Sequence, residues 1–138
     1  MVEWVNGRTA PRNVVFARQN LPLIVNNGKP VANLDNGEWG VTVGNAVLVW
    51  RSGIGVDAHG NLIYAAGNDQ SARSLADTLA RAGAIRAMEL DINSYWVSFI
   101  TYGGPSAANP VNLLPEMNRP ATRYLEPDDR DFFAVYQR

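Results

Sequence analysis

The chain has 138 residues, with 12 basic and 13 acidic side chains, one histidine and no cysteine. This length predicts one globular domain, residues 1–138, that buries a core without disulfides or a structural zinc. The lack of cysteine excludes thiol catalysis, iron–sulfur clusters and Cys-based zinc sites, and a single histidine excludes a His-rich metal site. A net charge of −1 without a Lys/Arg run excludes the basic surface of a typical nucleic-acid binder.

Membrane and export signals are missing from the sequence. No run of 18 apolar residues is present, so no membrane span is expected. The first residues lack the basic-then-apolar pattern of a signal peptide. Either the protein is cytoplasmic or an exported precursor begins elsewhere, and the compartment stays unknown.

Short apolar runs separated by Gly, Asn and Pro predict strands joined by hairpins. Two hairpin turns are expected, at Gly44-Asn45 and at Ala58–Asn61, where His59 is a solvated turn residue. The predicted strands, in chain order, are Val14–Ala17, Leu21–Val25, Val41–Val43, Ala46–Trp50, Ile54–Asp57, Leu62–Ala65, Ile85–Ile92, Trp96–Tyr102 and Asp131–Tyr136.

One helix is predicted over about residues 71–83. Ser71 suits its N-cap and Gly83 its C-terminal end. The apolar stripe between them has helical spacing and consists of Ala72, Leu75, Ala76 and Leu79. Since hairpins outnumber βαβ units, the predicted fold class is α+β, with a mainly antiparallel sheet and one packed helix.

The strand 85–92 carries candidate catalytic carboxylates. Strand alternation places Glu89, Asp91 and Asn93 on one face. The apolar residues between them, Met88, Leu90 and Ile92, are expected to face the helix. Carboxylates two residues apart on a strand lie roughly 6.5–7 Å apart, a separation found in glycosidase carboxylate pairs. The alternative is an ordinary solvated strand face.

The stretch Trp50–Asp57 carries candidate binding residues. Arg51, Gly53, Gly55 and Asp57 share one face, and glycines inside a strand indicate a bulge or the close approach of a ligand or another backbone. Arg51 and Asp57 are candidates to hold an anionic or hydroxyl-rich ligand. The alternative is a partly buried salt bridge between Arg51 and a carboxylate of the strand 85–92.

Further polar residues suit a sugar ligand. Arg18 and Asn20 lie between two apolar runs and offer guanidinium and amide donors. No cofactor is expected. Asp57, Asp91 and loop amides could hold a hard cation such as Ca²⁺, but no EF-hand-like spacing is present.

Four segments carry a family resemblance: Arg18–Leu23, Trp50–Asp57, Gly60–Leu62 and Leu75–Asp91. Their order and spacing resemble the C-terminal part of the phosphodiester glycosidase family, the relatives of the uncovering enzyme, N-acetylglucosamine-1-phosphodiester α-N-acetylglucosaminidase. The resemblance covers most of residues 13–102. The closing segments Arg123–Leu125 and Arg130–Phe132 resemble the actinobacterial branch.

The resemblance implies a hydrolase in which water cleaves a sugar-1-phosphodiester. It implies that Asp91 is the aspartate of the family's Asp-Gly-Gly-Gly-Ser turn and that Arg51 is its strand arginine, which steadies the phosphate. It also suggests an exported protein. The catalytic candidates are therefore Asp91 and Glu89. The substrate-binding candidates are Arg51, Asp57, Asn93, Arg18 and Asn20.

The chain departs from the family pattern in two places. Ile92-Asn93-Ser94 replaces the Gly-rich turn after Asp91, and the family's upstream Asn-Gly-Gly-Phe segment does not occur in these residues. These departures favour an alternative function, that of a truncated or degenerate relative, a pseudoenzyme, that binds glycan or partner protein. An exposed sheet edge would then allow self-association.

Overall fold

The computed structural model describes residues 1, 12–14, 21–34, 37–40, 44–103, 109–128 and 132–136. The chain divides into two compact units, Met1–Val97 and Ser98–Arg138.

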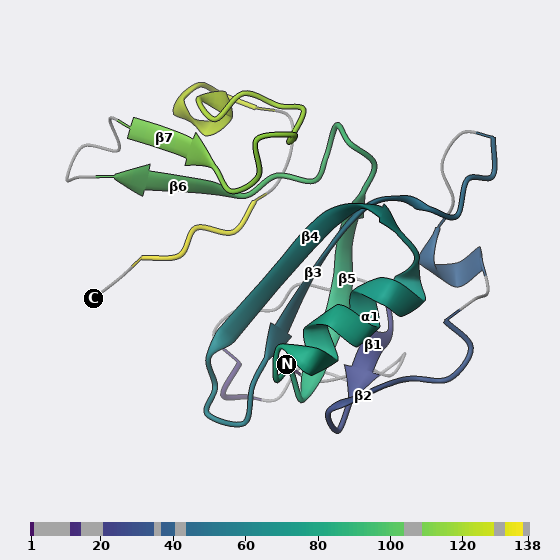
Figure 1. The fold of residues 1–138 in the computed structure, drawn as a ribbon. Coiled ribbons are helices and arrows are strands. Elements are labelled where there is room, and N and C mark those ends of the chain that lie inside the picture. Colours follow the sequence, from purple (N-terminus) through teal and green to yellow (C-terminus); the bar gives the residue numbers. More distant parts are fainter. Residues whose placement is uncertain are drawn as a thin grey trace. The chain divides into compact units, whose positions relative to one another are not determined.

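The described part of the first unit contains a five-stranded sheet with the strand order β2-β1-β5-β3-β4 (Figure 1). Every pair of neighbouring strands is antiparallel, which agrees with the predicted fold class. The strands are β1 (Leu23–Asn26), β2 (Lys29–Pro30), β3 (Val49–Val56), β4 (Leu62–Gln70) and β5 (Arg86–Ile92).

A helix, α1 (Ala72–Arg81), connects β4 to β5, which lie on either side of β3. Ser71 and Ser74 form a reciprocal capping box at its start, and Gly83 follows its end with a φ of 99°. The predicted apolar stripe is fully buried, so the predicted helix is confirmed. Among the described residues, no helix is long and apolar enough to cross a membrane.

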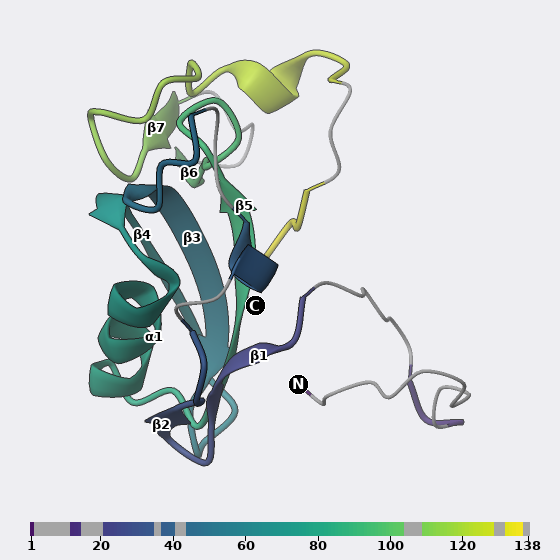
Figure 2. The ribbon, with the colours of Figure 1, turned by 90° about the vertical axis from the view of Figure 1, so that its right-hand side faces the viewer.

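Figure 2 shows α1 packed on one face of the sheet, which we call the helix face. The glycines of β3 lie on this face. A Cβ atom at Gly53 would lie 2.9 Å from Leu79 Cδ1, and one at Gly55 would lie 2.8 Å from Ala84 Cβ. The two glycines therefore make room for the helix and its following turn.

The strand β5 presents Ala87 and Glu89 to the helix face, each opposite one of these glycines. The expectation that Met88 and Leu90 meet the helix is therefore wrong. Small side chains on β3 and β5 let the helix approach closely, and this requirement selects the glycine-bearing face. Met88 and Leu90 lie on the other side of the sheet, which we call the opposite face.

Several predicted strands differ from the structure. Residues 15–17 and 41–43 lie outside the described residues, and Ala46–Leu48 precede β3 without forming a strand. Asn27 and Gly28, with φ values of 49° and 74°, form the tight turn between β1 and β2. A 3₁₀ helix, η1 (Gly37–Trp39), follows.

The second unit contains a two-stranded antiparallel sheet in its described part. Its elements are β6 (Ile100–Gly103), β7 (Asn109–Asn112) and a 3₁₀ helix, η2 (Arg123–Leu125). Only the end of the predicted strand Trp96–Tyr102 is extended. The predicted C-terminal strand is wrong for residues 132–136, because Phe132 packs on the Tyr124 ring at 4.7 Å rather than joining a sheet.

Candidate functional site

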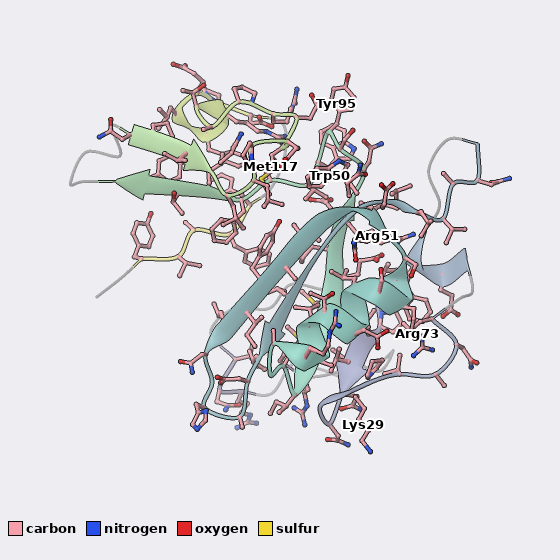
Figure 3. All side chains as sticks on the ribbon, viewed as in Figure 1. Lys29, Trp50, Arg51, Arg73, Tyr95 and Met117 are labelled. Atoms are coloured by element: carbon pink, nitrogen blue, oxygen red, sulfur yellow. The ribbon has the colours of Figure 1, made fainter. Side chains whose placement is uncertain are left out.

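Arg51 is buried on the helix face, where β3 passes the start of α1 (Figure 3). Its guanidinium donates five hydrogen bonds to described residues, which is its full capacity of N–H groups. The acceptors are Glu89 Oε2 at 2.9 Å and the carbonyl oxygens of Trp39 (2.7 Å), Gly40 (3.0 Å), Val47 (3.1 Å) and Gln70 (2.9 Å). Arg51 therefore joins four chain segments and has no N–H group left for a ligand.

Glu89 is 0% exposed and forms a buried ion pair with Arg51. Burial raises the pKa of Glu89 to about 7, while the charge of Arg51 and its hydrogen bond act in the lowering direction. This is the salt bridge that the alternative interpretation of Arg51 named. The Glu89 side chain is screened from solvent.

The pairing of β5 with β3 changes register near the end of β5. Gly53 lies opposite Glu89, but Arg51 lies opposite Ile92. One residue of β3 therefore faces the two residues 90 and 91 of β5. This two-against-one arrangement is a β-bulge.

The bulge moves Asp91 to the opposite face. Ile92 shares the helix face with Arg51, and a Cβ atom at Gly40 would lie 2.8 Å from Ile92 Cδ1. Asp91, the residue before it, therefore points away from Glu89 and is half-buried. The expectation that Glu89 and Asp91 share one face is wrong, because the extra residue reverses the alternation.

Hydrogen bonds to β3 hold the backbone around Asp91. Ser52 Oγ donates to the Asp91 carbonyl oxygen at 3.0 Å, and the Asn93 N–H donates to the Trp50 carbonyl oxygen at 2.8 Å. Asn93 has a φ of 89°, a conformation that favours glycine, and its Oδ1 accepts a bond from the Tyr95 N–H. Asp91 and Asn93 thus lie together at the end of β5.

The other predicted site residues lie elsewhere. Asp57 lies beyond the far end of β3, where its carboxylate accepts bonds from the N–H groups of His59 and Asn61 and from Asn61 Nδ2. These hydrogen bonds lower the pKa of Asp57, and the bond from the Asn61 side chain has the largest effect. His59 is an exposed turn residue, as predicted. The structure does not bring Asp57 to Arg51.

Arg18 and Asn20 lie outside the described residues. Within the described ranges, no three acidic or histidine side chains are grouped so as to hold a metal ion. Sequence reasoning missed Ser52 as a partner of Asp91. The available signal was a single hydroxyl on a strand face otherwise formed by Trp50 and Ile54.

A family model described as phosphodiester glycosidase matches residues 2–91, which include β1 to β4, α1 and β5 as far as Asp91. No curated protein matches the chain significantly. The crystal structure of a hypothetical protein from Synechocystis matches with 31% identity and a TM-score of 0.43, over 54% of this chain. The match spans 15% of that protein. Because the family model matches more than half of the residues of this chain, the chain belongs to the phosphodiester glycosidase family.

Proposed function

We propose that this phosphodiester-glycosidase-like domain binds and hydrolyses a sugar-1-phosphodiester at the end of β5, with Asp91 as the carboxylate that contacts the substrate. The bulge carries this proposal, because it turns Asp91 away from the buried Arg51–Glu89 pair. Bulges are frequent next to active sites, where they redirect a side chain. Family membership supports the substrate class.

The reaction assigns a proton-transfer role to Asp91. Water attacks the anomeric carbon, the bond from that carbon to the phosphate oxygen breaks, and Asp91 accepts a proton from the water. The sugar gains a hydroxyl group, and a phosphate monoester leaves with the bridging oxygen. Because every N–H group of Arg51 already has a protein acceptor, we assign the phosphate contact to Asn93, while Arg18 and Asn20 stay substrate-binding candidates outside the described residues.

The experiment follows conversion of a sugar-1-phosphodiester to a monoester by ³¹P NMR. Asp91→Asn removes the proton acceptor and keeps the side-chain size, so turnover should fall by about 100-fold or more. Asp77→Asn, an exposed carboxylate of α1, is the matched control and should retain wild-type turnover. Equal turnover in the wild type and Asp91→Asn would overturn the assignment.

A second candidate function, a non-catalytic binding module, is favoured by the edge strand β4. This strand has nine residues and contains no Pro, Lys or Arg, the residues that commonly protect an exposed edge. In the described part of the chain it pairs only with β3. We propose self-association through this edge as the property that tests the module.

Sedimentation velocity over a wide concentration range tests this association. A dimer that Ala66→Pro in the middle of β4 weakens would support the module, since proline cannot donate to a new strand. A monomer at every concentration would exclude association through β4. Turnover sensitive to Asp91→Asn would favour the enzyme instead.

A further inference from the structure

We infer that Ser52 is a positioning residue for Asp91. This inference rests on the proposed function, because it concerns how the same carboxylate is aimed. Ser52 is the β3 residue opposite the two-residue bulge of β5. It is 2% exposed and lies away from solvent, so it acts on the reaction through Asp91 and not through the substrate.

The bulge creates the need for such a residue. Two residues of β5 face one residue of β3, so the regular ladder of backbone hydrogen bonds is interrupted there. The Asp91 carbonyl oxygen in that gap is partly buried, and a polar group withdrawn from water needs a hydrogen-bond partner. Ser52 Oγ supplies it, 3.0 Å from the Asp91 carbonyl oxygen.

The Ser52 bond lies between two other contacts that hold the same stretch. On the helix face, Arg51 binds Glu89, the residue just before the bulge. Just after it, the Asn93 N–H donates to the Trp50 carbonyl oxygen. The Ser52 bond falls between these two points and acts on Asp91 itself. It therefore limits rotation of the Asp91 backbone, and this rotation sets the direction of the carboxylate.

The hydroxyl group, rather than the size of the side chain, is the property that matters. Ser52→Ala removes the donor with little change in volume. Ser52→Thr keeps a hydroxyl at the same position, and Ser52→Cys replaces it with a larger and weaker donor. Thr78→Val is a matched control, because Thr78 Oγ1 donates to the Ser74 carbonyl oxygen at 2.9 Å on the exposed side of α1.

The first test compares turnover of a sugar-1-phosphodiester by ³¹P NMR. Ser52→Ala and Ser52→Cys should lower kcat by about 10- to 100-fold with KM nearly unchanged, since a small misplacement of a reacting group has an effect of this size. Ser52→Thr should restore most of kcat, and Thr78→Val should match the wild type. Unchanged kcat in Ser52→Ala would overturn the inference.

The second test requires no substrate. Amide hydrogen exchange and the ¹³C signal of the Asp91 carboxyl are measured in the same variants. Ser52→Ala should speed exchange at Asn93 and shift the Asp91 signal, with the β3–β4 hairpin turn unaffected. If no variant has turnover but these signals change, the proposed function fails while Ser52 still positions Asp91. If neither signal changes, the inference fails.

Discussion

Glu89 and Asp91 lie two residues apart on β5, yet they lie on opposite faces of the sheet and differ in burial. On the helix face, Glu89 is enclosed and paired with Arg51, and its pKa is raised to about 7. On the opposite face, Asp91 is half-buried. One extra residue in β5 produces this difference.

The comparison separates two uses of a carboxylate. Glu89 pairs with Arg51 inside the fold, and Arg51 in turn binds the carbonyl oxygens of other segments. Removing one partner of such an enclosed pair is strongly destabilising, because it leaves the other group buried and uncompensated. Asp91 is half-buried on the other face, where Ser52 holds its backbone, and it is the carboxylate that we propose for chemistry.

The largest expected effect comes from removing the cation of the helix face. Arg51→Met leaves Glu89 and four carbonyl oxygens without their donor, and breaking a buried pair from one side costs about 3–5 kcal/mol. Urea unfolding measures the loss. Asp91→Asn, two residues from Glu89, should change the free energy of unfolding by less than about 1 kcal/mol. Equal losses in both variants would contradict the contrast between the faces.

The pH dependence of stability sharpens the same contrast. The pKa of Glu89 is raised from 4.5 to about 7 in the folded state, so the folded protein keeps a proton that the unfolded chain releases. The proton on Glu89 therefore stabilises the fold, and this stabilisation is complete below about pH 4.5 and is lost as the pH rises through about 7. The loss amounts to roughly 3 kcal/mol.

Urea unfolding of the wild type and Glu89→Gln across this pH range provides the measurement. Glutamine keeps an acceptor for Arg51 but does not titrate. The difference in unfolding free energy between the two proteins should therefore change with pH, in the direction that disfavours the wild type at high pH. A constant difference would show that Glu89 does not titrate with a raised pKa.

A smaller effect is expected from filling the space used by the helix. A Cβ atom at Gly55 would lie 2.8 Å from Ala84 Cβ and 3.0 Å from the Arg86 carbonyl oxygen, so Gly55→Ala should cost about 2 kcal/mol. Gly67→Ala on β4 meets only the Gln70 side chain at 3.5 Å and should be close to neutral. Thermal unfolding compares the two, and similar losses would refute close helix approach at Gly55.

Local signals made much of the fold predictable. The Ser71 cap, the apolar stripe and Gly83 define α1 within a few residues, and the turn after Asp57 defines the β3–β4 hairpin. The glycines of β3 correctly indicated the close approach of another part of the chain. The Arg51–Glu89 salt bridge was one of two interpretations of the same strand.

The bulge and its consequence were not predictable from β5 alone. Residues 88–93 alternate regularly in sequence, and the extra residue exists only relative to the register with β3. That register depends on long-range packing of Arg51, Glu89 and Ile92. Similarly, the apolar run 132–136 resembles a strand, but the Phe132 ring packs on Tyr124 instead.

The position of β5 between β1 and β3 constrains the order in which the sheet can assemble during synthesis. The β3–β4 hairpin and α1 are local and can form early. Among the described strands, β1 pairs with β2 and β5, and its residue Leu23 lies opposite Met88. During synthesis, β1 can therefore join the five-stranded sheet only after β5 has left the ribosome.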